Sequence, residues 1–340
     1  MSDGIQMSLL PECQSPIEIL LNQQKNIDER SPIVVSYGGG KNSTAMLIWL
    51  WRQGIVPDLI LFADTGGEKP ETYEFIEVFN QWLLNKGMPE ITMLRKKASK
   101  VSPNRRVLIK AKSNLIYCLS KKCSVSVEFL QLLIFWLGIS SSQPQTLEEE
   151  SLTHQSLPST AFGNSKCSVM WKIEPQDKYV EEWAIEHGHI TQQGRKKVWD
   201  YPIRRMIGYH CDEVKRLLTK TGEMRSLNDR YYRCEYPLMI SGLDEIACRV
   251  LILQEGLPLP IKSSCFFCPN TKLKDVELLP PELKARALLI EDTWRNGSQY
   301  RKSQIKGLGR RFAWGQVAEL SNLEQASISS IQESQCGCIE

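Results

Sequence analysis

Short apolar segments that alternate with helical patterns constrain the fold of this chain more than any other feature. Residues 33–35 and 59–63 are apolar throughout, which is typical of strands buried on both faces of a sheet, and residues 91–94 are expected to form a third strand. Residues 43–51 and 70–84, which lie between them, have a helical pattern. Helices that alternate with doubly buried strands indicate an α/β protein with a parallel sheet.

The same alternation resumes in the second half of the chain. Strands are expected at 201–209 and 231–238, and helices at 212–218 and 243–254. We therefore predict a Rossmann-like parallel sheet with helices on both faces, a mainly helical insertion and a C-terminal extension.

Changes in composition suggest three regions. A polar lead-in covers residues 1–30, an α/β nucleotide-binding domain covers 31–257, and a cysteine-containing extension covers 258–340. The domain carries an insertion at about 96–158. Its apolar run at 129–138 is about half the length of a membrane-spanning helix, so we expect a buried or partner-facing helix and no membrane role.

Bulk composition is ordinary for a globular protein. The 340 residues are 42% hydrophobic with a net charge of +3, too small an excess to indicate nucleic acid by itself. The first 14 residues lack the basic start and apolar core of a signal peptide, which predicts a cytoplasmic protein. Its 11 cysteines are then expected to be thiols, metal ligands or nucleophiles.

A glycine cluster follows the first expected strand and precedes a helix. Glycines let a backbone approach a phosphate, and the helix start offers unpaired N–H groups. A Walker A loop is excluded because Asn42 follows the Gly-Lys pair, and the dinucleotide pattern fails because Ser43 occupies its last glycine position. Lys41 would stabilise a leaving group. The expected phosphate-binding residues are Ser36, Gly38, Gly39, Gly40, Asn42, Ser43 and Thr44.

This loop resembles the pyrophosphate loop of the adenine nucleotide alpha-hydrolase superfamily, usually Ser-Gly-Gly-x-Asp-Ser. Gly39, Gly40 and Ser43 match it, whereas Gly38 and Asn42 replace its first serine and its aspartate. Residues 62–73 resemble the strand-end signature of the phosphoadenosine phosphosulfate (PAPS) reductase branch.

The resemblance assigns further site residues. It implies that Asp64 and Thr65 lie beside the glycine loop, because ligands bind beyond the carboxyl ends of parallel strands. Gly208, Glu213 and Arg216 resemble a later strand-to-helix signature of the branch, with Arg216 as a nucleotide-binding residue. The sequence also looks like members of the branch that are often phage- or plasmid-borne, and is related to the sulfur-transfer subunit of DNA phosphorothioation systems.

Cysteine spacing adds a candidate metal site. Cys265 and Cys268 form a CxxC, a spacing that suits a cluster, zinc or a redox pair. Similarity to adenosine phosphosulfate reductases implies a [4Fe–4S] cluster on these two thiols and Cys167, with Lys172 as a catalytic neighbour. Ser168 stands where a further cysteine is usual. The tail cysteines, Cys336 and Cys338, or Cys234, are candidates for the fourth ligand, and structural zinc is the alternative.

Three functions follow from the resemblance. The first is sulfur or adenylyl transfer from ATP with Mg²⁺, with Lys41, Asp64 and Lys172 as catalytic residues, pyrophosphate release, and a sulfur donor as partner. The second is reduction of PAPS or adenylyl sulfate with a thioredoxin-like partner, although Cys336 lacks the glutamate that precedes the reductase cysteine. The third is a non-catalytic nucleotide-binding accessory protein.

Further partners are left open by the sequence. A tRNA or DNA acceptor is compatible with the basic residues between 95 and 106 and at Arg310 and Arg311, although such residues more often form a solvated basic surface. A homo-oligomer is compatible with the sequence as well.

Overall fold

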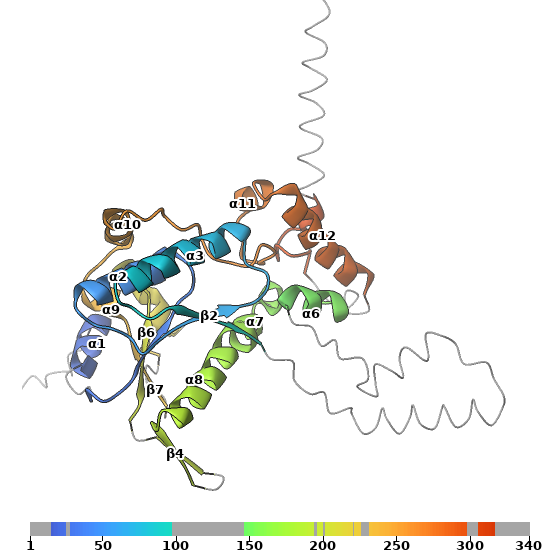
Figure 1. Ribbon diagram of the computed structural model, residues 1–340. Coiled ribbons are helices and arrows are strands. Elements are labelled where there is room, and N and C mark those ends of the chain that lie inside the picture. The colour runs from blue at the N-terminus through green and yellow to red at the C-terminus, as the bar shows by residue number, and fades with distance from the viewer. Residues whose placement is uncertain are drawn as a thin grey trace, which may run out of the picture. The chain divides into compact units, whose positions relative to one another are not determined.

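The computed structural model describes residues 15–24, 28–96, 146–193, 196–199, 201–219, 221–225, 231–297 and 305–316 (Figure 1). The chain divides into two compact units. Unit 1 comprises residues 1–94 and 165–268, and unit 2 comprises residues 95–164 and 269–340. Each unit is therefore built from two separate stretches of sequence.

Unit 1 is organised around a five-stranded sheet. Its order is β3-β2-β1-β6-β7, and β1 pairs in parallel with β2 and β6, while β6 pairs in parallel with β7. The strands are β1 (Ile33–Ser36), β2 (Leu59–Asp64), β3 (Ile91–Arg95), β6 (Ile203–Ile207) and β7 (Tyr232–Glu235). The order reverses beside β1, so the switch point at which α/β sheets bind ligands lies between the carboxyl ends of β1 and β6.

Adjacent residues of β1 pack into separate hydrophobic cores, as expected for a strand covered on both faces. Val35 belongs to a core with α2 (Lys41–Arg52), α3 (Pro70–Asn85) and α10 (Glu245–Gln254). Val34 belongs to a second core with α8 (Glu174–Glu186). Figure 1 shows α2 and α3 on one side of the sheet and α8 on the other. The predicted α/β parallel-sheet fold is confirmed.

The helix over the second face begins irregularly. A short α7 (Lys166–Ser168) continues into a π-helical segment (Val169–Ile173) and then into α8. In a π turn each hydrogen bond spans one residue more than in an α-helix, which widens the helix locally, and such turns are frequent at functional sites. At its other end α8 leads into a two-stranded hairpin of β4 (Ile190–Gln193) and β5 (Lys196–Trp199).

Several element boundaries differ from those predicted. The strand expected at 231–238 ends at Glu235, because Pro237 has no N–H to donate and instead begins α9 (Pro237–Ile240). The helix expected at 212–218 is the 3₁₀ segment η3 (Cys211–Leu217), with a kink at Glu213. The lead-in forms α1 (Pro16–Gln24).

Unit 2 is helical in its described part. It contains α6 (Leu147–Thr153), η1 (Ser159–Phe162), α11 (Leu273–Glu277) and α12 (Pro281–Asn296). Arg286 on α12 forms an ion pair with Glu148 on α6, joining the two stretches. Most of the expected insertion, including residues 129–138, lies outside the described residues. None of the helices among the described residues has both the length and the apolar character needed to cross a membrane.

Glu291 organises the last described segment of unit 2. Its carboxylate is fully buried and accepts hydrogen bonds from the backbone N–H groups of Leu308, Trp314 and Gly315 at 2.8–3.1 Å. Arg295 donates to it as well, at 2.9 Å. One acidic side chain on α12 thus fixes the path of residues 305–316.

Candidate functional site

The glycine loop lies between β1 and α2, at the switch point of the sheet. Gly39 has φ +71°, a conformation that favours glycine, and Gly40 caps α2. The Gly38 N–H donates to Ser43 Oγ at 3.2 Å, and the Ser43 hydroxyl donates to the Gly40 carbonyl at 3.1 Å. The loop therefore has a fixed shape before any ligand binds. The first N–H groups of α2 have no acceptor within the helix, as at any helix start.

Two predicted phosphate-binding hydroxyls are used inside the protein. Ser36 Oγ donates to Gln176 Oε1 on α8 at 2.8 Å. Thr44 is fully buried, and its hydroxyl donates to the Gly40 carbonyl at 3.0 Å. These two side chains support the loop from the protein interior, whereas Gly38 on the loop is exposed.

Two further segments pack tightly against this loop. A Cβ on Gly208, just after β6, would lie 2.9 Å from both the backbone N and the Cα of Ser43. A Cβ on Gly40 would lie 3.0 Å from the hydroxyl of Ser263. The loop is thus enclosed by the end of β6 and by the segment that leads into the CxxC.

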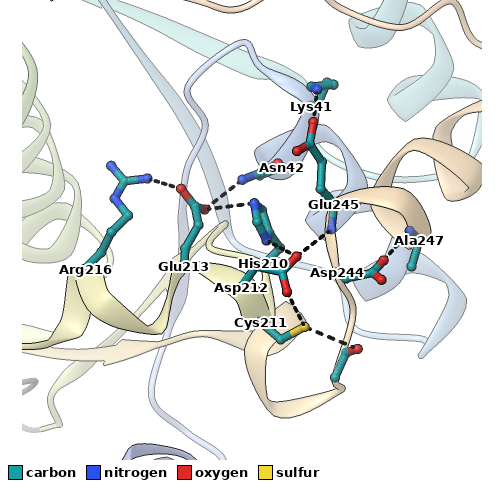
Figure 2. A network of polar contacts seen from close by, with 11 residues as sticks. Lys41, Asn42, His210, Cys211, Asp212, Glu213, Arg216, Asp244, Glu245 and Ala247 are labelled. Carbon is teal, nitrogen blue, oxygen red and sulfur yellow. Dashed lines mark hydrogen bonds and ion pairs between the residues drawn. The ribbon is translucent and has the colours of Figure 1, made fainter.

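Polar side chains from three elements surround the first residues of α2, as Figure 2 shows. Lys41 Nζ is 2.5 Å from Glu245 Oε1 at the start of α10. Asn42 Nδ2 donates to Glu213 Oε2 at 2.9 Å, and Arg216 Nη1 donates to Glu213 Oε1 at 2.8 Å. The Glu245 N–H contacts Asp212 at 3.5 Å. His210 lies between Asp212 and Glu213, at 3.4 and 3.7 Å. The predicted residues Lys41, Asn42 and Arg216 therefore belong to one network.

The Asp64 motif forms a rigid turn at the end of β2. Asp64 is fully buried, and its Oδ1 accepts hydrogen bonds from the Gly66 N–H and the Tyr73 hydroxyl, both at 2.7 Å. Burial, followed by this bond to Asp64, raises the pKa of the Tyr73 hydroxyl. Thr65 Oγ1 lies 3.2 Å from Cys265 Sγ. The motif thus connects the strand end to the CxxC segment.

A buried ion pair lies beside the same cysteine. Glu68 is 4% exposed, and its Oε1 accepts a bond from Lys172 Nζ at 2.9 Å, while its Oε2 has no hydrogen-bond partner among the described residues. Burial lowers the pKa of Lys172, but the Glu68 carboxylate and the Cys265 and Cys268 thiols together outweigh it, so the net pKa is raised. Lys172 belongs to the π turn, and Glu68 forms a β-bridge with Cys265. Three segments therefore meet at Glu68.

Only some of the predicted metal ligands are among the described residues. Cys265 and Cys268 share a turn, with the Cys268 N–H donating to the Cys265 carbonyl at 3.0 Å. Burial, followed by the Glu68 carboxylate, raises the pKa of the Cys265 thiol to about 12. Among the described residues, which include Cys167, no three or more His, Cys, Asp or Glu side chains form a group that could hold a metal ion.

A cluster on these thiols would thus require residues beyond the described part. Cys336 and Cys338 lie outside the described residues, so the cluster and zinc alternatives stay predictions.

Sequence reasoning assigned no role to several residues that shape the site. Glu68 and Tyr73 lie within the motif at 62–73, where an acid and a phenol close to a buried strand end could have indicated a role. Gln176 and Glu245 come from distant helices, and no local pattern marks them. Of the basic residues considered for nucleic acid, Arg310 donates through Nε to the Thr160 carbonyl at 2.6 Å within unit 2.

Fold and site together define an α/β protein with a glycine-rich loop at the switch point of a parallel sheet. No family model matches the chain, and no curated protein sequence is similar to it. Among solved structures, it is similar to phosphoadenylyl-sulfate (PAPS) reductase from Candida auris, in a phosphate complex. That similarity covers 73% of this chain and 82% of the other, at 12% identity and a TM-score of 0.36. At such low values, a function has to be inferred from this chain's own site residues.

Proposed function

We propose that this chain binds an adenine nucleotide, ATP or a PAPS-type phosphosulfate, by its phosphates on the loop 38–43. We further propose that, with ATP, an acceptor oxygen attacks the α-phosphorus and pyrophosphate leaves, which activates the acceptor for sulfur or adenylyl transfer. The phosphates would lie against the first N–H groups of α2, where the helix dipole favours negative charge. Lys41 would leave Glu245 and neutralise the departing pyrophosphate.

One observation carries this proposal. The segment 263–268 contacts both motifs, since Ser263 packs against Gly40 of the glycine loop and Cys265 lies 3.2 Å from Thr65. A segment that carries two thiols therefore packs directly against the glycine loop proposed to bind phosphates. Sulfur chemistry next to a bound nucleotide is the function that best accounts for this placement.

The chain's own residues divide the expected tasks. Asp64 and Tyr73 hold the strand-end turn, and Glu68 keeps Lys172 charged beside Cys265. The Lys172 ammonium would then stabilise negative charge that develops near the thiol. Mg²⁺, when bound, would offset phosphate charge. Because no group of three acidic side chains suited to a metal is present among the described residues, the phosphates and water would supply most of its ligands.

Nucleotide binding is the first test. Isothermal titration of the full-length protein with ATP, PAPS and adenylyl sulfate should show saturable binding of at least one, and Gly39→Val should abolish it. Gly39 has a positive φ, and its Cβ would lie 3.1 Å from Phe62 and Thr72 side-chain atoms. Gly54→Val is the matched control, since that glycine has a similar φ and open space around it. Absence of binding by all three nucleotides would refute the proposal.

Turnover separates the candidate reactions. Pyrophosphate release from ATP, tested alone and with tRNA or DNA plus a sulfur donor, is the expected result for transfer. Sulfite release from PAPS or adenylyl sulfate with thioredoxin would instead assign the reductase reaction. Binding with neither product would leave the accessory role.

Metal content needs a separate measurement. Anaerobically purified protein should be assayed for visible absorption, iron, acid-labile sulfide and zinc, in parallel with Cys265→Ala and Cys268→Ala. A brown protein whose iron is lost in both variants supports the cluster. Stoichiometric zinc lost in both variants supports the structural-zinc alternative, and a metal-free wild-type protein excludes both.

A further inference from the structure

Two carboxylates hold the first two side chains of α2, but they do so differently. Glu245 pairs with Lys41, and Glu213 accepts a hydrogen bond from Asn42 (Figure 2). Both bring negative charge to the rim of a loop proposed to bind phosphates. By Coulomb's law alone, removing either charge should tighten the binding of a polyanion.

Glu213 is fixed by groups on several sides. Its Oε2 accepts from Asn42 Nδ2 at 2.9 Å, its Oε1 accepts from Arg216 Nη1 at 2.8 Å, and His210 Nε2 lies 3.7 Å from Oε2. The side chain is 22% exposed. Its charge is therefore compensated locally by Arg216, and both of its oxygens are engaged.

Arg216 is held from a second direction. Its guanidinium lies over the Tyr209 ring, 4.0 Å from the centroid, and Tyr209 in turn stacks on Tyr236 at 5.5 Å between centroids. Tyr209 directly follows Gly208, which packs against the start of α2. Glu213 and Tyr209 thus fix the position of a cation at the switch point, while Glu213 also fixes a side chain of the loop.

Glu245 has no comparable support on its carboxylate. Its side chain is 51% exposed, and its carboxylate pairs with Lys41. The ammonium of Lys41 lowers the pKa of the Glu245 carboxyl. An exposed single ion pair contributes little stability and can be exchanged for another partner. A bound phosphate would be such a partner for Lys41.

We propose that Glu213 is a positioning residue, which orients Asn42 and Arg216 toward the nucleotide phosphates, and that Glu245 competes with those phosphates for Lys41. The inference rests on the proposed nucleotide-binding function and extends it. It predicts effects of opposite sign for two like-charged residues at one loop.

Binding of ATP with Mg²⁺, measured by isothermal titration calorimetry on the full-length protein, tests the pair. Glu213→Gln should weaken binding by about three- to tenfold, the range for loss of one oriented hydrogen-bonded group. Glu245→Gln should tighten it by about two- to fivefold, as an exposed ion pair is removed. Glu77→Gln, an exposed acid on α3, is the matched control and should change nothing.

A second variant separates geometry from charge. Glu213→Asp keeps the charge but shortens the side chain, so a positioning role predicts weaker binding and a purely electrostatic role predicts no change. A double-mutant cycle of Glu213→Gln with Asn42→Ala should be non-additive, because the first acts through the second. Thermal melts of every variant confirm folding.

The outcomes are distinguishable. Wild-type protein that does not bind ATP overturns both the proposed function with ATP and this inference. Wild-type binding together with undiminished binding by Glu213→Gln and Glu213→Asp overturns the inference alone. Weaker binding by Glu245→Gln would overturn the competing role of Glu245.

Discussion

Gly208 lies so close to Ser43 that a single added carbon would be 2.9 Å from the serine's backbone nitrogen and Cα. Real Cβ atoms do not approach backbone atoms this closely, so the end of β6 or the start of α2 would have to move. This contact fixes the distance between the two elements on either side of the switch point. It explains why a glycine stands directly after β6, where the chain turns toward η3.

Gly208→Ala should therefore destabilise unit 1 and weaken nucleotide binding. Overpacking of this kind costs about 1–3 kcal/mol of the free energy of unfolding. Urea unfolding measures the cost. Gly38→Ala is the matched comparison for stability, because its Cβ would meet nothing closer than Ser43 Oγ at 3.8 Å. Equal stability of the two variants would show that the close packing at Gly208 is unimportant.

Lys41→Met should weaken ATP binding by about tenfold, because it removes a charge-assisted contact to phosphate while retaining most of the side chain's volume. Lys86→Met provides the control. Lys86 also belongs to unit 1 and pairs with an acid, Glu255, at 3.2 Å, but lies over the Trp51 ring. Calorimetric titration that gives the same affinity for both variants would remove Lys41 from the binding site.

The contribution of the Glu68–Lys172 pair to the free energy of unfolding should be lost at alkaline pH. The pKa of Lys172 is raised in the folded protein from its ordinary value of 10.5. Folding therefore favours the protonated lysine. The contribution is fully present below pH 10.5 and is lost as pH rises through the folded-state pKa.

Urea unfolding between pH 8 and pH 11 should show this loss in wild-type protein. In the double variant Glu68→Gln/Lys172→Met the additional loss should be absent. Parallel curves for the two proteins across this range would contradict the assignment.

Glu291→Ala should loosen the last described segment of unit 2. Three backbone N–H groups and Arg295 would lose a buried acceptor at once, a change that costs about 3 kcal/mol or more. Hydrogen exchange at Leu308, Trp314 and Gly315 should accelerate. Glu282→Ala, an exposed acid on the same helix, should leave these rates as in wild-type protein.

The architecture of unit 1 could be predicted from local patterns. Doubly apolar segments such as 59–63 are strands because buried parallel sheets expose neither face. Pro70 begins α3 as expected from its fixed φ. The end of β7 was predicted wrongly. Pro237 was included in the expected strand, which it cannot continue because it has no N–H to donate.

The part of the site that one contiguous segment forms could be predicted, whereas the part contributed by distant elements could not. The glycine loop is one contiguous segment, so its residues were identified together. Glu245 and Gln176 reach the same loop from 204 and 140 residues away, respectively. Their positions follow from helix packing across the sheet, which no sequence spacing encodes.

The two-part composition of unit 2 has a consequence for how the chain is made. Its helix α6 is anchored to α12 by Glu148 and Arg286, which are 138 residues apart. During synthesis at about 5–20 residues per second, α6 leaves the ribosome about 7–28 seconds before its partner helix does. Helices α8 and α10 and strand β6, which belong to unit 1, emerge in that interval. We therefore expect unit 1 to be able to fold first, and unit 2 to close only after α12 has been synthesised.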